Sequence, residues 1–300
     1  MKAGYAAIIG LPNAGKSTLL NSILGQKISI TTKKPQTTRK RILGILSGED
    51  FQIVFLDTPG ILTPHYMLQE RMMEYVDRSV RDADIIILLI DMESDPKGEK
   101  FFNQIFVKEL MERNTAYKLL ILNKIDKSNE TIMNEIVSYY SKDGRINKII
   151  PISASLGANV NEVVNSIKEQ LPENPKFYPE DNVSDESERF FVSEIIREKI
   201  FEHYKEEIPY STEVLIADFK EQENRKDVIS AEIVVERESQ KGIIIGKKGE
   251  AIKRIGEKAR IDIEKFLDRP VFLELRVKVR AKWRSDENML KSFGYTRDKE

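Results

Sequence analysis

The sequence predicts an α/β domain with a mainly parallel sheet and helices on both faces, followed by a smaller α+β domain. The 300 residues suffice for about two domains of roughly 150 residues each. Apolar runs of strand length alternate with helical stretches over the first 170 residues, and three prolines then interrupt the chain in "LPENPKFYPED". We therefore expect a first domain over residues 1–172, a linker over 173–181 and a second domain over 182–300.

The first domain is predicted to alternate between strands and helices. The strand-like apolar runs are "GYAAIIG", "RILGIL", "FQIVFLD", "ADIIILLID", "YKLLILN" and "NKIIPIS". The second and third runs are joined by the turn "SGED" and are expected to form one antiparallel hairpin. Helical spacing of apolar residues predicts helices over Lys16–Leu24, Tyr66–Val80, Lys97–Glu112, Thr131–Tyr140 and Val160–Leu171.

The second domain has a different pattern. Helices are expected over Ser187–Tyr204 and Glu250–Leu267, with strands near Ser211–Phe219, near Val228–Glu236 and in "VFLELRVKVRA". Residues 237–284 contain fifteen lysines and arginines and seven aspartates and glutamates. Residues 181–236 contain seven lysines and arginines and sixteen aspartates and glutamates. Such charge runs commonly mark solvated surface, but the basic window also contains a glycine-lysine loop.

Composition excludes several classes of site. The chain has no cysteine, so disulfides, thiolate nucleophiles and cysteine zinc sites are absent. Its two histidines, His65 and His203, are far apart in the sequence, which argues against a histidine metal site. No apolar run approaches the ~20 residues of a membrane span, and "MKAGYAAIIG" is too short and interrupted for a signal peptide. We expect a soluble intracellular protein.

A phosphate-binding loop is predicted at "GLPNAGKS". The segment follows a strand-like run and opens a helix, the context in which G-x-x-x-x-G-K-S binds phosphates. Backbone N–H groups and the helix N-terminus would face the phosphates, Lys16 would reach the β- and γ-phosphates, and Ser17 would ligate Mg²⁺. The predicted phosphate contacts here are Gly10, Leu11, Pro12, Asn13, Ala14, Gly15, Lys16, Ser17 and Thr18.

A second phosphate-side element is "LDTPG", at the end of another strand-like run. Asp57 is placed to hold Mg²⁺, through water, and the Gly60 N–H can meet the γ-phosphate. On its own, the same stretch would be an ordinary proline-glycine turn. The predicted contacts are Asp57, Thr58, Pro59, Gly60 and Ile61.

The base is predicted from "NKID" and "SAS". Guanine offers N1–H and N2–H side by side, and one carboxylate, Asp126, can accept both, whereas adenine would leave it unpaired. Asn123 can bind the other base edge and tie the loops together, Lys124 can lie over the purine, and the Ala154 N–H can reach the guanine oxygen. Together the four elements predict a GTP site, whose guanine contacts are Asn123, Lys124, Ile125, Asp126, Ser153, Ala154 and Ser155.

These motifs resemble those of the translation-factor-related GTPases, and "GQKISITTKKPQTTRKRI" is similar to the first switch region of the Era GTPases, a TrmE-Era-EngA-like group. The resemblance implies a P-loop GTPase domain and a threonine that ligates Mg²⁺ when GTP is bound. We favour Thr38, which precedes Arg39, while Thr37 stays open. The implied switch residues are Gln36, Thr37, Thr38, Arg39 and Lys40.

The sequence departs from Ras-like enzymes after "DTPG". Those enzymes place a water-orienting glutamine where this chain has Ile61, which cannot hydrogen-bond water. Slow intrinsic hydrolysis is therefore expected unless another group helps. In related GTPases with "PNxGKS" a similar asparagine helps to bind a monovalent cation, so Asn13 is a candidate ligand for K⁺. A turn-forming asparagine is the alternative.

The second glycine loop lies in "IIIGKKGEAIKRIG". Two residues between its glycines are too few to wrap a nucleotide triphosphate, and the loop stands between an apolar run and an amphipathic helix. This setting resembles a KH domain of type II, whose G-x-x-G turn clamps single-stranded nucleotides. A simple helix-start turn is the alternative. The predicted RNA contacts are Ile245, Gly246, Lys247, Lys248, Gly249, Ile252 and Arg254.

The resemblance to the Era GTPases covers nearly the whole chain and implies a function. It implies a slow GTPase with Mg²⁺ that binds 16S ribosomal RNA near its 3′ end and assists assembly of the small ribosomal subunit. A cytoplasmic monomer is expected, and peripheral contact with the cell membrane is known in the family. Two alternatives remain open: an RNA-binding chaperone with structural GTP, and a membrane-recruited signalling GTPase. Trp283 and "KSFGY" could stack RNA bases or seal the edge of the domain.

Overall fold

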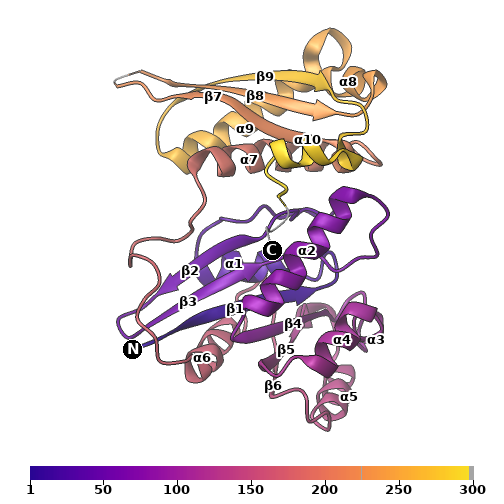
Figure 1. Ribbon diagram of the computed structural model, residues 1–300, viewed down its shortest axis with the longest axis vertical. Coiled ribbons are helices and arrows are strands. Elements are labelled where there is room, and N and C mark those ends of the chain that lie inside the picture. Colours follow the sequence, from indigo (N-terminus) through magenta and orange to yellow (C-terminus); the bar gives the residue numbers. More distant parts are fainter. Residues whose placement is uncertain (224, 297–300) are drawn as a thin grey trace. The chain divides into compact units, whose positions relative to one another are not determined.

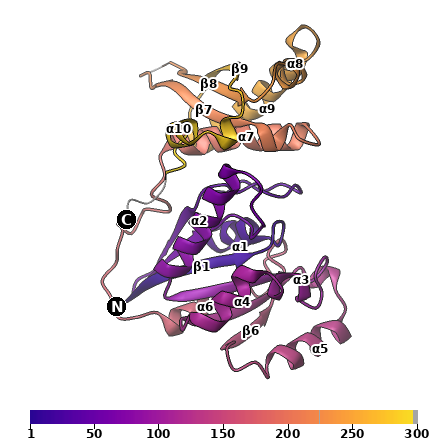
Figure 2. The same cartoon turned by 45° about the vertical axis from the view of Figure 1, so that its right-hand side comes forward.

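The computed structural model describes residues 1–223 and 225–296 (Figures 1 and 2). The chain forms two compact units. The first contains Met1–Pro64 and Met72–Asp185, and the second contains Glu186–Glu300 together with the short segment His65–Arg71. The units correspond to the two predicted domains, although their limits differ in detail.

The first unit is built on a six-stranded sheet. Its strands lie in the order β2-β3-β1-β4-β5-β6, and every neighbouring pair is parallel except β2 and β3. The predicted antiparallel hairpin is therefore confirmed. The strands are β1 (Lys2–Gly10), β2 (Ile42–Ser47), β3 (Phe51–Asp57), β4 (Ile85–Asp91), β5 (Tyr117–Asn123) and β6 (Lys148–Pro151).

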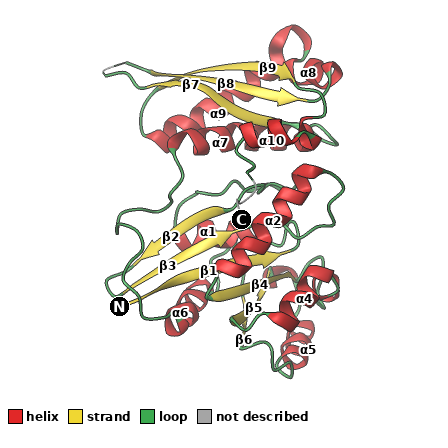
Figure 3. Ribbon diagram, viewed as in Figure 1, coloured by secondary structure: helices red, strands yellow, loops and turns green. Residues whose placement is uncertain are grey.

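Helices cover both faces of this sheet (Figure 3). The helices α1 (Lys16–Leu24) and α6 (Val160–Gln170) contact each other on one face. The other face packs against α2 (Met67–Asp82), α3 (Glu99–Phe102), α4 (Ile105–Arg113) and α5 (Glu130–Tyr140). The predicted α/β class is confirmed.

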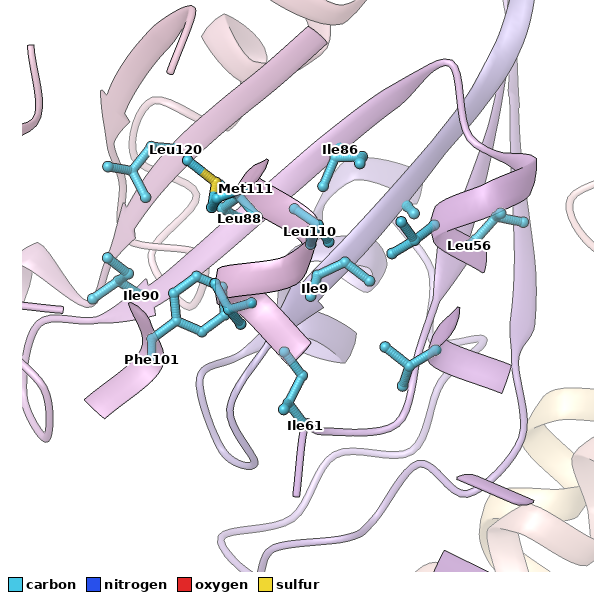
Figure 4. Packing of buried hydrophobic residues seen from close by; sticks show 14 of the residues in the cluster. Ile9, Leu56, Ile61, Ile86, Leu88, Ile90, Phe101, Leu110, Met111 and Leu120 are labelled. Carbon is cyan, nitrogen blue, oxygen red and sulfur yellow. The ribbon is translucent and has the colours of Figure 1, made fainter. Parts of the chain in front are cut away.

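The core on this second face is formed by alternate strand residues, because successive strand side chains point to opposite faces. Ile9, Ile86 and Leu88 lie in it with Leu110 of α4 (Figure 4). Ile61, which follows the Asp57–Gly60 turn, belongs to the same cluster and is only 3% exposed. A position expected beside the nucleotide therefore contributes to the core.

The predicted helix over Lys97–Glu112 is wrong in one respect, because the structure divides it into α3 and α4. Gln104 has an extended conformation, with φ −63° and ψ 134°, which ends the first helix and starts the second. The apolar spacing continues across the break because Phe101 and Val107 are buried in the same core. Periodicity alone could not locate the break.

The proline-bearing segment packs against the first unit. The side chain of Gln52 in β3 accepts hydrogen bonds from the N–H groups of Phe177 and Tyr178 and donates one to the Tyr178 carbonyl. Farther along, Ile45 N–H donates to the Val183 carbonyl at 2.8 Å. The first unit therefore extends to Asp185 rather than ending before a free linker over 173–181.

The second unit has a three-stranded sheet, β7-β8-β9, in which β8 pairs antiparallel with β7 and parallel with β9. The core order is helix, strand, strand, helix, helix, strand, the arrangement expected of a KH domain of type II. The elements are α7 (Glu188–His203), β7 (Glu213–Lys220), β8 (Asp227–Val235), α8 (Glu238–Ile245), α9 (Glu250–Leu267), β9 (Val271–Val279) and α10 (Glu287–Ser292).

The apolar run before the glycine loop is the helix α8, which the sequence analysis missed. Consecutive isoleucines favour a strand by propensity. The Gln240 side chain instead accepts the N–H groups of Glu236 and Arg237, which satisfies donors at the helix start. Ile244 is fully buried, and its carbonyl accepts a hydrogen bond from the Tyr204 hydroxyl. Local capping by Gln240 and the tertiary contacts of Ile244 together therefore override the strand propensity.

The C-terminal aromatic residues seal the second unit, and the alternative that they stack RNA bases is wrong. Trp283 is fully buried and its indole N–H donates to the Ser211 carbonyl at 3.0 Å. Tyr295 is 1% exposed and its hydroxyl donates to the Glu213 carboxylate at 2.7 Å. The Phe293 ring lies 5.5 Å from that of Trp283. Rings buried in this way present no face to a base.

Candidate functional site

A cleft of about 1040 Å³ lies in the first unit and collects most of the predicted motifs. Its walls come from the loops that follow β1, β3, β4 and β5, together with the segment between α1 and β2. The carboxyl ends of parallel strands share one edge of a sheet, so loops distant in sequence meet there. This volume is in the range of pockets that hold small ligands.

The phosphate loop places Lys16 at the base of the cleft. Its ammonium donates to the carbonyls of Gly10 and Leu11, at 3.2 and 3.1 Å. Burial lowers the pKa of Lys16 to about 8, although the nearby Asp57 carboxylate acts in the opposite direction. The loop needs glycine at Gly15, where φ is 98° and a Cβ would lie 2.3 Å from the Asn123 amide nitrogen.

Three oxygen-bearing side chains from separate elements meet beside this loop. The Ser17 hydroxyl donates to Asp57 Oδ2 at 2.6 Å and lies 2.9 Å from the Thr38 hydroxyl. Asp57 is fully buried, and its Oδ1 has no hydrogen-bond partner among the described residues. A buried carboxylate oxygen beside two hydroxyls is the all-oxygen donor set that suits Mg²⁺, so these residues fit the metal.

Burial also raises the pKa of Asp57. Hydrogen bonds from Ser17 and Ser29 and the charge of Lys16 counteract this effect, but burial is the larger cause. A bound cation would favour the ionised carboxylate.

The two candidate threonines have different neighbours. The hydroxyl of Thr37 lies 2.9 Å from that of Thr32 and donates to the Lys34 carbonyl within the same loop. Thr38 is 7% exposed and lies against Ser17 instead. The loop geometry therefore brings Thr38, and not Thr37, to the Ser17 hydroxyl.

At the other end of the cleft, two loops are joined through Asn123. Its amide nitrogen donates to the Ala14 carbonyl at 2.8 Å, and its amide oxygen accepts the Ala154 N–H at 3.0 Å. The hydrogen bonds of Asn123 thus connect the two loops, which is one part of the role predicted for it. The Ala154 N–H, which we expected on the guanine oxygen, donates to Asn123 in this structure.

The Asp126 carboxylate lines the same end. Its Oδ1 accepts a hydrogen bond from the Ser153 hydroxyl at 2.6 Å, which orients the carboxylate plane. Its side chain is 22% exposed, so its acceptor oxygens can be reached from the cleft. This arrangement can accept two adjacent N–H groups.

Acidic residues after β4 were missed by the sequence analysis. Lys124 donates to Asp91 Oδ2 at 2.7 Å, and Glu93 lies 3.4 Å from the same ammonium. Burial would raise the pKa of Asp91, but the hydrogen bonds from Lys124 and Ser94 hold it below its ordinary value. These residues line the cleft and position Lys124. The available signal was that Asp91 ends the strand-like run "ADIIILLID" at the same sheet edge.

Not every predicted residue borders the cleft. Ile61 turns its side chain into the core, and its N–H donates to the Gly10 carbonyl at 3.1 Å. A side-chain contact of Ile61 with phosphate is therefore wrong. The predicted residues that line the cleft are Pro12, Asn13, Gly15, Lys16, Ser17, Thr18, Gln36, Thr37, Thr38, Gly60, Asn123, Lys124, Asp126 and Ser155.

Asn13 links the phosphate loop to the switch segment. Its amide nitrogen donates to the Lys33 carbonyl at 3.1 Å, and its backbone has φ 65°. The side chain therefore lies beside a backbone carbonyl at the mouth of the cleft, the kind of oxygen that can coordinate a monovalent cation.

In the second unit, the glycine loop connects α8 to α9. Gly246 and Gly249 have φ of 72° and 80°, and Lys248 between them has φ 51°, so the turn has a positive φ at three positions. Lys247 and Lys248 are exposed and form no ion pair with another described residue. Their charges are available to an anion.

Comparison with known proteins defines the class. The family model described as 50S ribosome-binding GTPase matches residues 5–124, and the KH domain model matches residues 207–284. The chain is thus a P-loop GTPase domain followed by a KH domain.

Full-length relatives narrow this class to one family. GTPase Era of Geobacter sp. (strain M21) is 46% identical over 294 residues, and GTPase Era of Clostridium botulinum (strain Eklund 17B / Type B) is 43% identical over 295, each covering 98% of both chains. A crystal structure of Era in complex with MgGDPNP and nucleotides 1506–1542 of 16S ribosomal RNA is 41% identical, with a TM-score of 0.91 over 99% of this chain and all of that one. The chain belongs to the Era family of GTPases.

Proposed function

We propose that this protein is a GTP-hydrolysing switch that binds the 3′ end of 16S ribosomal RNA and assists assembly of the small ribosomal subunit. One observation carries the proposal: a cleft lined by the Asp126 carboxylate, which can accept two adjacent N–H groups, and an exposed Gly-Lys-Lys-Gly turn occur on one chain. The relative of 41% identity that was solved with MgGDPNP and 16S nucleotides supports it.

In this proposal the cleft binds GTP through its two ends. Asp126, oriented by Ser153, accepts the N1–H and N2–H of guanine, and Lys124, held by Asp91, lies over the purine. Lys16 and the N–H groups of residues 13–18 hold the phosphates. Of the switch residues, Gln36, Thr37 and Thr38 line the phosphate side of the cleft, and Gly60, which also lines it, would meet the γ-phosphate.

Mg²⁺ would be held by Ser17, Thr38 and Asp57. When bound, it neutralises the charge on the β- and γ-phosphates. The chain's own contribution is to bring the three oxygens together from α1, the switch segment and β3.

The attacking water cannot be oriented by Ile61, whose side chain is buried in the core. We propose that hydrolysis depends on a monovalent cation, K⁺, bound by Asn13 and a carbonyl of the switch segment. The hydrogen bond from Asn13 to the Lys33 carbonyl supports this placement. A cation beside the phosphates would stabilise charge that develops in the transition state.

RNA would bind along the glycine loop and the adjoining part of α9. Lys247 and Lys248 face the phosphates, and the two glycines let the backbone approach closely. The proposed contacts are Ile245, Gly246, Lys247, Lys248, Gly249, Ile252 and Arg254.

We further propose that the protein acts in the cytoplasm as a monomer, with any membrane contact peripheral. Among the residues that the structure describes, no helix has both the length and the apolar character needed to cross a membrane.

The test is binding and crosslinking to an RNA that carries the 3′ end of 16S ribosomal RNA. Tighter binding is expected with a non-hydrolysable GTP analogue than with GDP, and linkage makes the effect reciprocal. Changing both Lys247 and Lys248 to Glu is expected to weaken binding strongly and to reduce the salt dependence of the binding that remains. A matched control changes the exposed Lys108 and Lys142 of the first unit to Glu.

Two outcomes would contradict the proposal. RNA binding that survives the Lys247 and Lys248 changes would leave the glycine loop structural and favour a signalling GTPase. Single-turnover hydrolysis that is absent with and without RNA would favour an RNA chaperone with structural GTP.

A further inference from the structure

Ser29 is a buried polar residue within "GQKISITTKKPQTTRKRI", but it is not among the site residues predicted from that segment. It lies between α1 and β2, four residues after the helix-ending Gly25, and is 1% exposed. Its hydroxyl donates to Asp57 Oδ2 at 2.9 Å. A residue at the start of the switch segment therefore contacts the carboxylate proposed to hold Mg²⁺.

The position of Ser29 is set by Asn21 of α1. The Asn21 amide oxygen accepts the N–H groups of Ile28 and Ser29, both at 3.0 Å, and its amide nitrogen donates to the Ser29 carbonyl at 2.7 Å. Asn21 follows Ser17 by four residues, so both side chains lie on the same face of the helix. One helix thus carries Ser17 and also fixes the backbone that carries Ser29.

Two hydroxyl groups donate hydrogen bonds to the same oxygen of the Asp57 carboxylate. Oδ2 accepts from Ser17 at 2.6 Å and from Ser29 at 2.9 Å, while Oδ1 has no partner among the described residues. Two donors on Oδ2 restrict rotation of the carboxylate and direct it as a unit. Of the two donors, Ser17 is itself a proposed metal ligand, whereas Ser29 is not, and its hydroxyl donates to Asp57.

We propose that Ser29 is a positioning residue that orients Asp57 for Mg²⁺. Through this hydrogen bond, the start of the switch segment affects how strongly Mg²⁺ retains the bound nucleotide. This inference rests on the proposed Mg²⁺ site at Ser17, Thr38 and Asp57. Outer-shell partners of metal ligands commonly change metal affinity by about 10- to 100-fold when they are removed.

The experiment measures release of a fluorescent, non-hydrolysable GTP analogue from the full chain as Mg²⁺ is titrated. Ser29→Ala is expected to raise the half-saturating Mg²⁺ concentration by about tenfold. Without metal, in excess chelator, the release rate is expected to equal that of the wild type, because the Asn21 bonds to the Ser29 backbone remain. Ser29→Cys, similar in size but a weak donor, should show the same direction if the alanine variant folds poorly.

Two controls separate the possible outcomes. Ser79→Ala removes an equally buried hydroxyl, one that donates to the Tyr75 carbonyl of its own helix, and should leave the titration unchanged. Ser17→Ala should raise the Mg²⁺ requirement. If it does not, the proposed metal site fails. If Ser17→Ala raises it and Ser29→Ala does not, only the inference about Ser29 fails. Equal acceleration of release with and without metal would reduce Ser29 to a structural support of the loop.

Discussion

Nucleotide affinity is predicted to fall as the pH rises through the pKa of Lys16. Burial lowers this pKa from 10.5 to about 8, and only the protonated side chain attracts phosphate. Bound phosphates add negative charge beside the ammonium and raise its pKa again, so binding above pH 8 requires proton uptake. The nucleotide affinity is therefore highest well below pH 8 and decreases progressively as the pH rises above 8.

The size of the effect follows from the titration. With a pKa of about 8, roughly nine-tenths of the free protein carries a protonated Lys16 at pH 7 and roughly one-tenth at pH 9. The affinity for GDP should then fall about tenfold over this range, equal to about 1.4 kcal/mol of binding free energy. Calorimetry near pH 8, in two buffers of different ionisation enthalpy, should detect uptake of a fraction of one proton.

The matched control is Lys16→Arg, because guanidinium does not titrate in this range while every other group on protein and nucleotide still does. Its affinity is expected to be lower overall and to change from pH 7 to pH 9 only by what these other groups contribute. A flat profile in the wild type, or the same slope in both proteins, would refute the reasoning.

Three further predictions concern the rest of the site and the RNA loop. Asp126→Asn should shift base preference from GTP toward xanthosine triphosphate, because the amide donates where the carboxylate accepted; unchanged GTP affinity would contradict the base assignment. K⁺ in place of Na⁺ should raise hydrolysis in the wild type, and Asn13→Ala should remove the difference, with Asn13→Gly as a companion because φ 65° strains alanine; equal rates in both salts would exclude the cation. Gly249→Asp adds about 1–2 kcal/mol of backbone strain at φ 80° and a negative charge beside RNA, and should weaken RNA binding by about tenfold or more while leaving nucleotide affinity intact. Gly144→Asp, at an exposed glycine with open space around it, is its control, and equal losses in both would mean that the loop is not the clamp.

Most of the nucleotide site could be predicted because its chemistry is local. The phosphate loop and "NKID" are short segments whose backbone groups and side chains act within a few residues of one another. Their convergence could also be predicted, since each follows a strand-like run and parallel strands end at one sheet edge. The class of both domains followed in the same way, from the alternation of strands and helices and from the glycine loop before an amphipathic helix.

Element boundaries were less predictable where local and tertiary preferences differ. The apolar spacing from Phe101 to Val107 continues through an extended Gln104, because both sides of the break face one core. No element was predicted for the three consecutive isoleucines, whose propensity favours a strand, whereas burial of Ile244 and the capping contacts of Gln240 select a helix. The shared core and the burial of Ile244 are not visible in a window of neighbouring residues, whereas the Gln240 contacts span only three and four residues and were a local signal that the sequence analysis missed.

Which way individual side chains face was decided by the tertiary structure alone. The sequence placed Ile61 directly after the turn of "LDTPG", but a hydrophobic core assembled from distant strands and helices takes up its side chain. From the sequence, Trp283 was equally compatible with stacking on RNA and with burial. The structure decides for burial, because the indole N–H donates to the Ser211 carbonyl. No role could be assigned to Ser29 or Asp91 from the sequence, since Ser29 donates to Asp57 and Asp91 accepts from Lys124, each about thirty residues away in the chain. Motifs specify backbone chemistry, whereas the direction of a side chain depends on the partners that folding brings to it.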